Sequence, residues 1–246
     1  MKVDYDKIAP NYDKHRQTEG PYMPQLVELA REVGAHHVLE LGCGTGRSAA
    51  SFLAAHPCRL IALDPSQGML EKARERGIHG VEWLRASATD IPLKSDLFQL
   101  VFGVFFIHHV PDLAGVAREC ARVISQGAAA IVTASTQFIK THPMNRYFPS
   151  LAPMDLARFR TGDEIEAALR CAGFGRTRVG SYKAPPQSID DAYVQKVAGK
   201  FTSTYELIPA DEFEAGLARL KADVAGNRQL EKIVEWEWTL VTGFTL

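Results

Sequence analysis

Three glycines at alternate positions follow a short apolar run, and this combination constrains the fold of the chain more than any other feature. The run HVLEL covers 37–41, and Gly42, Gly44 and Gly46 come before a helical stretch that begins at Arg47. A strand, a tight turn and a helix in this order are typical of an open α/β sheet, in which ligands bind beyond the carboxyl ends of the strands. Because glycine has no β-carbon, we expect a ligand to lie directly against this loop.

The same alternation of strand and helix continues through the first half of the chain. The next expected strands cover 59–64, 81–86, 98–106 and 127–135, and the expected helices cover 21–34, 66–77 and 112–124. The strands are almost continuously apolar, which is typical of a parallel sheet covered by helices on both faces. The sequence therefore predicts a doubly wound α/β fold.

After Ser135 the pattern changes. Residues 136–160 are rich in proline, aromatic side chains and methionine, and we interpret them as a cap over a pocket. Thr161 and Glu164 have the spacing of a capping box and predict a helix that ends near Gly173. The sequence then predicts a strand at 176–182, helices at 190–201 and 210–225, and a half-exposed strand near the sheet edge within 233–244.

The charge and the cysteine content argue against several classes of protein. The 246 residues carry a formal net charge of -1, so no overall positive field attracts nucleic acid or an anionic membrane. No C-x-x-C pair, as in zinc sites, occurs among the four cysteines, Cys43, Cys58, Cys120 and Cys171. The N-terminus has no secretory pattern, and no run of about 18 apolar residues occurs. We therefore expect a cytoplasmic monomer or homodimer without a metal, nucleic-acid or membrane partner.

Two common nucleotide-binding loops fit the glycines less well. A dinucleotide-binding loop, G-x-G-x-x-G, would need a glycine where the chain has Arg47, and a P-loop would need a lysine before Ser48. The spacing in this chain is G-x-G-x-G. A nicotinamide dehydrogenase and a phosphate-binding protein are therefore the weaker interpretations.

The glycine loop, together with acidic residues at the strand ends, resembles the class I S-adenosylmethionine-dependent methyltransferases, in particular their methyltransferase 11 type. The matching features are Glu40 before the loop, Asp64 in ALDPSQGML, Asp90 in ASATDIPL and the segment FGVFFIHHV at 102–110. The resemblance covers roughly residues 1–135. It implies a mostly parallel, seven-stranded, Rossmann-like sheet with an antiparallel edge strand and a helical cap insertion.

The resemblance also implies a single methyltransferase domain over residues 1–246. Within it we expect an N-terminal lid at 1–20, a cofactor-binding core at 21–135, substrate-cap segments at 136–161 and 184–230, and the rest of the sheet at 162–183 and 231–246.

In this family the loop and the acids hold S-adenosylmethionine, and the resemblance implies the same cofactor here. Asp64 would bind both ribose hydroxyls, Asp90 would face the adenine amino group, and Glu40 would hold the ammonium group. Tyrosines of the segment YDKIAPNYDKH would close over the methionine end. The complete predicted cofactor site is Tyr5, Tyr12, Glu40, Gly42, Cys43, Gly44, Gly46, Asp64, Pro65, Met69, Ala88, Thr89, Asp90, Ile91 and Phe105.

Simpler structural roles stay open for several of these residues. Asp64 could cap the next helix or close a turn before Pro65, and Glu40 could accept hydrogen bonds from loop amides. Met69 could belong to the core of the following helix. The N-terminal tyrosines could lie in a frayed segment, as chain ends often do.

Methyl transfer from a sulfonium requires mainly alignment of the acceptor and exclusion of water. His108 and His109 follow the fourth strand and are the candidate general bases, with packing or capping as their alternative role. In the cap, His142, Arg146 and Tyr147 are the candidate acceptor-binding residues, with solvated surface or core as the alternative.

The sequence therefore predicts an enzyme that transfers a methyl group from S-adenosylmethionine to a small molecule. A protein that binds the cofactor without methylation, as a sensor or assembly partner, is the alternative from another class. An RNA or protein methyltransferase is less favoured, because the net charge is near zero and no Asn-Pro-Pro-Tyr-type motif follows the fourth strand.

Overall fold

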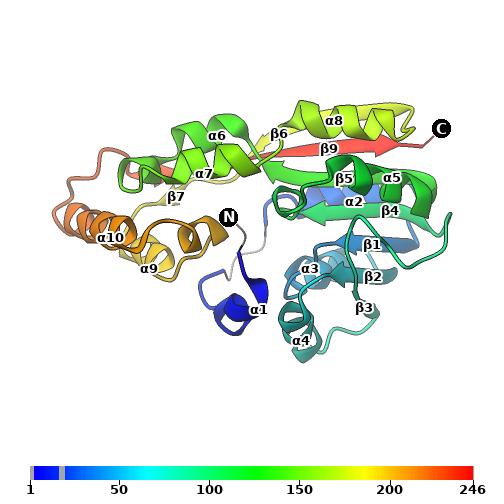
Figure 1. Ribbon diagram of the computed structural model, residues 1–246, viewed down its shortest axis with the longest axis horizontal. Helices are drawn as coiled ribbons and strands as arrows, with labels where there is room; N and C mark the ends of the chain where they lie inside the picture. The colour runs from blue at the N-terminus through cyan, green and yellow to red at the C-terminus, as the bar shows by residue number, and fades with distance from the viewer. Residues whose placement is uncertain (1–2, 17–19, 246) are drawn as a thin grey trace.

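The computed structural model describes residues 3–16 and 20–245, and a seven-stranded sheet forms its centre (Figure 1). The strand order is β3-β2-β1-β4-β5-β9-β6. In that order the strands cover Val81–Arg85, Arg59–Asp64, His37–Leu41, Phe98–Val104, Ile124–Ala134, Glu237–Phe244 and Arg176–Lys183. The strands from β3 to β5 run parallel, and β9 runs antiparallel to β5 and β6. The chain order reverses between β1 and β4, the position at which such sheets bind ligands.

Helices cover both faces of the sheet, because successive residues of each buried strand point to opposite faces. In β1, Val38 packs in the core beneath α2 and α3, whereas Leu39 packs in the core beneath α5 and α8. A fifth helix, α4, lies against β2 and β3. The helices α2, α3, α4, α5 and α8 cover Met23–Glu32, Arg47–Ala55, Gln67–Glu75, Leu113–Val123 and Gly162–Cys171.

The cap has a core of its own, separate from the two cores of the sheet. Its largest buried side chains include Phe148, Tyr193 and Tyr205. Figure 1 shows the cap as a helical layer beside the sheet, on the left of the view. It consists of α6 (Thr136–Thr141), η3 (Pro143–Arg146), α7 (Leu151–Arg158), β7 (Gln187–Ser188), α9 (Asp191–Ala198), η4 (Ser203–Glu206), α10 (Ala210–Ala225) and β8 (Ile233–Val234).

The N-terminal segment, residues 3–16, contains α1 (Tyr5–Ile8) and η1 (Ala9–Asn11) and lies between the cap and the sheet (Figure 1). Asp6 fixes it to the start of α4, because its Oδ1 accepts hydrogen bonds from Ser66 Oγ at 2.7 Å and from Gly68 N at 2.8 Å. The segment therefore packs against the sheet domain on one side and approaches the cap on the other.

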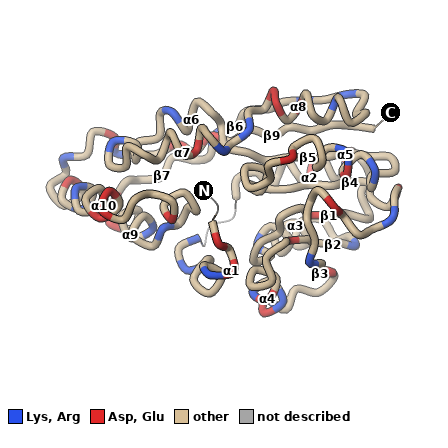
Figure 2. Tube along the Cα trace, in the orientation of Figure 1, with Lys and Arg blue, Asp and Glu red and all other residues tan. Residues whose placement is uncertain are grey.

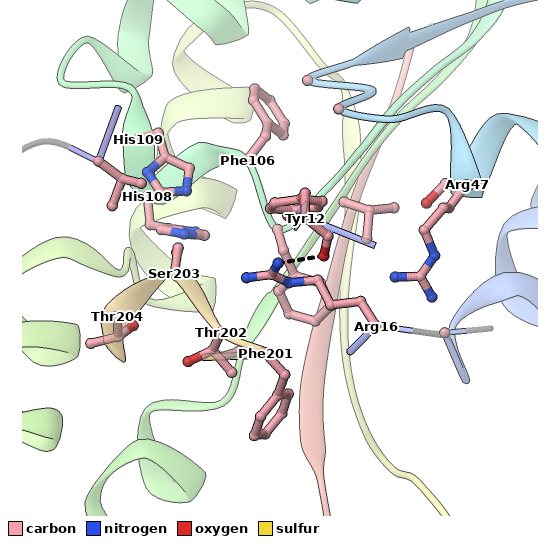
Figure 3. Close-up of a pocket in the computed structure, with 18 of the residues that line it drawn as sticks. Tyr12, Arg16, Arg47, Phe106, His108, His109, Phe201, Thr202, Ser203 and Thr204 are labelled. Atoms are coloured by element: carbon pink, nitrogen blue, oxygen red, sulfur yellow. Dashed lines mark hydrogen bonds between the residues drawn. The ribbon is translucent and has the colours of Figure 1, made fainter. Parts of the chain in front are cut away.

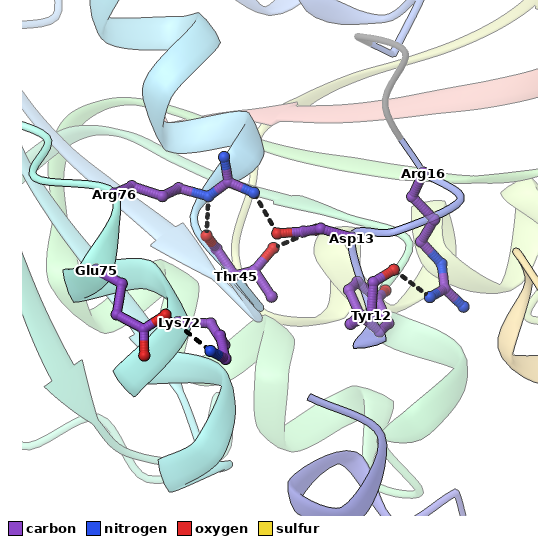
Figure 4. A network of polar contacts seen from close by, with 7 residues as sticks. All are labelled: Tyr12, Asp13, Arg16, Thr45, Lys72, Glu75 and Arg76. Carbon is purple, nitrogen blue, oxygen red and sulfur yellow. Dashed lines mark hydrogen bonds and ion pairs between the residues drawn. The ribbon is translucent and has the colours of Figure 1, made fainter. Parts of the chain in front are cut away.

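A second attachment of the N-terminal segment is made by Asp13. Figure 4 shows its carboxylate between Thr45 of the glycine loop and Arg76 at the end of α4. Thr45 Oγ1 donates to Asp13 at 2.8 Å, and the guanidinium of Arg76 also donates to the carbonyl oxygen of Thr45. These contacts connect the N-terminal segment directly to the glycine loop.

The predicted fold class is confirmed, with one difference in the last strand. The stretch 233–244 forms two elements rather than one half-exposed strand: β8 pairs with β7, and β9 enters the large sheet. β9 is buried after its first residue, because β6 lies outside it and occupies the edge. The alternation of Glu235 and Glu237 with apolar residues thus reflects the approach to the strand rather than the strand itself.

The capping box of α8 is present as predicted. Thr161 Oγ1 accepts from Glu164 N at 3.1 Å, and the Glu164 carboxylate accepts from Thr161 N at 2.7 Å. All four cysteines are free thiols. Within 3–16 and 20–245, none of the helices has the length and apolar character needed to cross a membrane.

Candidate functional site

A cavity of about 1520 Å³ opens at the carboxyl ends of β1, β2 and β4. We call its wall at residues 40–69 and 87–89 the sheet side, and its wall at residues 138–159, 184–205 and 234–236 the cap side. The N-terminal segment borders both sides. Pockets for one small ligand usually measure about 300–1000 Å³, so this cavity has room for more than one small molecule.

Most of the predicted site residues border this cavity, although they come from separate parts of the chain. Those that line it are Tyr5, Tyr12, Glu40, Gly42, Cys43, Gly44, Asp64, Pro65, Met69, Ala88, Thr89, Phe105, His108, His109 and His142. Those that the structure places outside its lining are Gly46, Asp90, Ile91, Arg146 and Tyr147.

The three glycines of the loop are required for two different reasons. All have positive φ, at 66° for Gly42, 54° for Gly44 and 78° for Gly46. A β-carbon on Gly42 would lie 2.4 Å from Cβ of Phe106, and one on Gly46 would lie 2.5 Å from the ring of Trp83. A β-carbon on Gly44 would meet no atom within 4 Å. Gly44 therefore borders open space, whereas Gly42 and Gly46 make room for protein side chains, which corrects the prediction for Gly46.

Asp64, at the end of β2, presents its carboxylate to the same loop. Oδ2 accepts from Gly44 N and Oδ1 accepts from Ser66 N, both at 2.9 Å. Burial raises the pKa of this carboxyl, and the two backbone hydrogen bonds act in the opposite direction. Each oxygen of a carboxylate accepts a second hydrogen bond, so two hydroxyl donors fit the unused positions. Closing the turn and binding a diol are thus compatible roles for Asp64.

Glu40 is almost completely buried at the end of β1, with 1% exposure. Its Oε2 has no hydrogen-bond partner among the residues that the structure describes. Burial, with a smaller contribution from the nearby Asp64, raises the pKa of this carboxyl well above its usual value. A buried polar group without a partner is unfavourable, and a positively charged donor in the cavity would supply one. The site therefore fits a ligand with an ammonium group at Glu40.

The third predicted acid, Asp90, does not line the cavity. It is exposed, and its backbone N donates to the carbonyl oxygen of Ser87 at 3.1 Å in a tight turn. Ile91 turns into the core, with its N donating to Glu119 at 2.7 Å. The turn therefore directs the neighbouring Ala88 and Thr89 to the cavity instead.

The two tyrosines of the N-terminal segment face each other across the cavity mouth, with ring centroids 6.1 Å apart. The hydroxyl of Tyr5 lies 2.6 Å from Nε2 of His109. Burial raises the pKa of both tyrosines, so both are neutral hydrogen-bonding groups near neutral pH. Tyr5 thus connects the N-terminal segment to the turn that follows β4.

His108 and His109 differ in their surroundings although they are adjacent. His108 stacks on Phe159 with ring centroids 4.0 Å apart, and its buried Nδ1 has no hydrogen-bond partner among the described residues. Burial lowers the pKa of His108 well below its usual value, with a smaller effect of His109. His108 is therefore a neutral wall of the cavity and a weak proton acceptor.

The three predicted acceptor-binding residues of the cap also differ in their surroundings. His142 lines the cavity, its Nδ1 accepts from Met144 N at 3.0 Å, and burial lowers its pKa to about 4. Arg146 is exposed on the surface. Tyr147 lies in the cap core and donates its hydroxyl proton to Asp223 at 3.2 Å. The structure therefore does not place Arg146 and Tyr147 at the predicted acceptor site, because η3 turns both side chains away from the cavity.

Phe105 joins the two sides of the cavity. It follows β4 with a φ of 49°, an uncommon conformation for a bulky residue. Its ring contacts Trp236 with centroids 5.1 Å apart and Tyr22 with centroids 5.8 Å apart. Unusual backbone conformations of this kind cluster at functional sites.

Several lining residues were not singled out from the sequence. They come from the N-terminal segment, from the turn after β4 and from the cap, and Figure 3 shows them around one space: Arg16, Phe106, Phe201, Thr202, Ser203 and Thr204. Only the high aromatic content of the cap indicated such a wall. The segment 201–204 carries no motif, because its position depends on the packing of the whole cap.

The sheet side of the molecule matches a known protein family. The family model described as "Methyltransferase domain" matches residues 39–132. A demethylmenaquinone methyltransferase from Clavibacter sepedonicus is 32% identical over 135 residues, which cover 52% of this chain and 55% of the relative. One from Lactiplantibacillus plantarum is 34% identical over 150 residues, or 54% and 61% of the two chains. The chain thus matches little more than half the length of these curated relatives.

Solved structures share the fold over nearly the whole chain. A candidate methyltransferase from an antibiotic biosynthesis pathway of Anabaena variabilis has a TM-score of 0.74 at 21% identity, covering 94% of this chain and 99% of that one. The [4+2]-cyclase SpnF has a TM-score of 0.60 at 16% identity, covering 98% and 94%. Together with the glycine loop and the acids at the ends of β1 and β2, the family match indicates that residues 39–132 correspond to a methyltransferase domain.

Proposed function

We propose that this protein transfers a methyl group from S-adenosylmethionine to a small-molecule acceptor held between the sheet side and the cap side. The observation that carries the proposal is the buried carboxylate of Glu40, which lies beside the open face of Gly44 and the carboxylate of Asp64. Oε2 of Glu40 has no hydrogen-bond partner in the part of the chain that the structure describes. An amino acid group and a ribose are the parts of the cofactor that these three residues suit.

The chain's own residues fit this cofactor on the sheet side. Glu40 would accept from the ammonium group, Asp64 would accept from the ribose hydroxyls, and the backbone at Gly44 would lie against the ligand. Met69 and Ala88 supply buried apolar surface for the adenine. When bound, S-adenosylmethionine supplies a methyl group on an activated sulfonium, so the protein mainly needs to position the acceptor.

Exclusion of water is the task of the N-terminal segment and the cap. Tyr5 and Tyr12 cover the cavity, and the contacts of Asp6 and Asp13 hold this cover against α4 and the glycine loop. A closed site of this kind protects the methyl donor from water. Where the acceptor must lose a proton, His109, hydrogen-bonded to Tyr5, is better suited than the desolvated His108.

The alternative, cofactor binding without methylation, is kept because the fold alone does not specify methyl transfer. SpnF, a [4+2]-cyclase by its name, shares this fold. Turnover distinguishes the two functions: the proposal requires that S-adenosylhomocysteine form when an acceptor is supplied, and the alternative requires tight cofactor binding with no turnover on any fraction of a metabolite extract.

Calorimetric titration of S-adenosylmethionine and S-adenosylhomocysteine tests the cofactor part of the proposal. We expect micromolar binding by the wild type and a loss of about 100-fold or more in Asp64→Ala, since two charge-assisted hydrogen bonds contribute about 1.5–3 kcal/mol each. Glu40→Gln removes the charge while it keeps the shape, and it should weaken binding by about tenfold or more. Asp211→Ala is the matched control, because Asp211 is exposed at the start of α10 and does not line the cavity. Absence of wild-type binding, or an equal loss in Asp211→Ala, would contradict the proposal.

A further inference from the structure

The cap side of the cavity carries five aromatic rings. They come from α6, the end of α7, the segment before η4, η4 itself and the approach to β9, and they are Phe138, Phe159, Phe201, Tyr205 and Trp236. Phe138 and Trp236 contact each other with centroids 5.9 Å apart, and Trp236 also contacts Phe105. Such walls favour a ligand with a flat, apolar body.

The cation Arg16 adjoins these rings at the wall that also includes Lys196 of α9. The guanidinium carbon of Arg16 lies 3.8 Å from the ring centroid of Tyr12, and its two terminal nitrogens donate to carbonyl oxygens of Tyr12 at 2.6 Å and Lys200 at 3.1 Å. These contacts tie the N-terminal segment to the cap. They use two of the five N–H groups of the guanidinium and supply no negative charge.

The carboxylates around the cavity are directed elsewhere. Asp155 pairs with Arg158 at 2.9 Å, and Asp13 pairs with Arg76. Glu40 and Asp64 lie on the sheet side, at the ends of β1 and β2. Among the residues that the structure describes, Arg16 therefore forms no ion pair. Arg16 is half-buried. Partial desolvation of a cation that forms no ion pair is costly, and an anionic ligand would offset that cost.

We propose that the methyl acceptor is an aromatic or similarly flat apolar molecule with a carboxylate or phosphate group, and that Arg16 binds this anionic group where the lid meets the cap. This inference rests on the proposed function, since it names the acceptor class of the same cavity. A guanidinium fork matches the paired oxygens of either anion, so both groups share one recognition chemistry.

The position of Arg16 favours the acceptor over the carboxylate of the cofactor itself. Figure 3 shows its guanidinium directed toward Thr202 and Ser203 of the cap, whereas Arg47, which follows the glycine loop, lies on the other side of Tyr12. The hydrogen bond to Lys200 places Arg16 against the cap as well. A cofactor seated on Glu40, Gly44 and Asp64 would occupy the opposite wall.

The test uses the whole protein and three naphthalene probes of equal ring size: 2-naphthoate, 2-naphthyl phosphate and the uncharged 2-naphthamide. Binding of each is measured by calorimetry with and without saturating S-adenosylhomocysteine. We expect naphthoate or naphthyl phosphate to bind about tenfold more tightly than naphthamide, as a charged hydrogen bond allows. The ratio of the two anions shows which group the site prefers.

Three variants assign the preference to Arg16. Arg16→Gln keeps an N–H donor without the charge and should abolish the preference for the anion, whereas Arg16→Lys keeps the charge and should retain most of it. Lys14→Gln is the matched control, because Lys14 is an exposed cation in the same segment and does not line the cavity. Its anion preference should equal that of the wild type.

The outcomes separate this inference from the proposed function. Equal binding of the anions and naphthamide, no binding of either anion, or unchanged preference in Arg16→Gln overturns the inference alone, provided that S-adenosylhomocysteine binds. A loss of S-adenosylhomocysteine affinity in Arg16→Gln, with the naphthoate preference unchanged, would assign Arg16 to the cofactor instead. Failure of the wild type to bind S-adenosylhomocysteine contradicts the proposed function, while the titrations without it still decide whether Arg16 selects an anion.

Discussion

The sheet side and the cap side of the cavity place their polar groups in different ways. On the sheet side, Glu40 and Asp64 stand at the ends of adjacent parallel strands, and backbone N–H groups orient Asp64. On the cap side, the polar groups come from segments that are distant in sequence, as when Arg16 donates to Lys200 across the lid and the cap. Figure 2 shows charged residues on separate elements of the cap, among them α7, α9 and α10. The polar groups of the sheet side are thus positioned by neighbouring strands and loops, whereas those of the cap side are positioned by the packing of segments distant in sequence.

The largest expected effect tests whether the two sides are independent. Phe148 is fully buried in the cap core, so Phe148→Ala should lower the free energy of unfolding by about 3–5 kcal/mol. If the sheet side is independent, the affinity for S-adenosylhomocysteine should change by no more than about 0.5 kcal/mol. Urea unfolding and calorimetry measure the two quantities. The control is Leu156→Ala, at an exposed position of α7, which should change the free energy of unfolding by less than about 0.5 kcal/mol. A large loss of S-adenosylhomocysteine affinity in Phe148→Ala would show that the two sides are coupled.

Substitutions in the glycine loop should affect stability and cofactor affinity differently, depending on which glycine is replaced. Gly42→Ala should lower the free energy of unfolding by about 3 kcal/mol, because its new β-carbon meets Phe106 at positive φ. Gly44→Ala should cost only about 1 kcal/mol of stability, since its β-carbon enters open space. It should nevertheless weaken S-adenosylmethionine binding by about tenfold, because the methyl group stands where the ligand lies. The reverse ranking in thermal unfolding and calorimetry would refute this assignment of the loop.

The cap should respond to acid through His142. The pKa of this imidazole is lowered from 6.5 in the unfolded chain to about 4 by burial, so the unfolded state binds more protons between these values. Its contribution to stability is complete above pH 6.5 and is lost as the pH falls toward 4, by about 1.4 kcal/mol per unit. His142→Asn keeps an acceptor for Met144 N and should reduce this slope in urea unfolding at several pH values. An unchanged slope would mean that other groups cause it.

The smallest expected effect concerns the attachment of the lid. The ion pair of Asp13 with Arg76 is about one-third exposed, so Asp13→Ala should change global stability by only about 1 kcal/mol or less. It should speed the dissociation of S-adenosylhomocysteine a few-fold, because the lid loses its contacts with Thr45 and Arg76. Stopped-flow displacement measures this rate. The control is Lys72→Ala, which removes the surface ion pair with Glu75 seen in Figure 4 and should leave the dissociation rate unchanged. An equal acceleration in Lys72→Ala would argue against a specific role of Asp13.

The parts of the fold that follow from short-range patterns were predictable. The apolar strands, the capping box of Thr161 and Glu164, and the loop at Gly44 depend on neighbours within a few residues. The place of β9 inside the sheet was not predictable, because it depends on pairing with β5 and β6 and not on the alternation before Glu237. The place of Asp90 outside the cavity lining was not predictable for a related reason, since the turn at Ser87 decides which residues of this segment face the cavity.

The sequence by itself determined the α/β class, the resemblance to methyltransferases and the position of Glu40, Gly44 and Asp64 at the strand ends, because strand, loop and acid are adjacent in the chain. Only the tertiary structure decided that Gly46 makes room for the ring of Trp83, that Tyr147 belongs to the cap core, and that Arg16 donates a hydrogen bond to the cap. The physical reason is distance along the chain: contacts between residues far apart form only when separate elements pack together, and packing selects which side of each helix or turn faces the ligand.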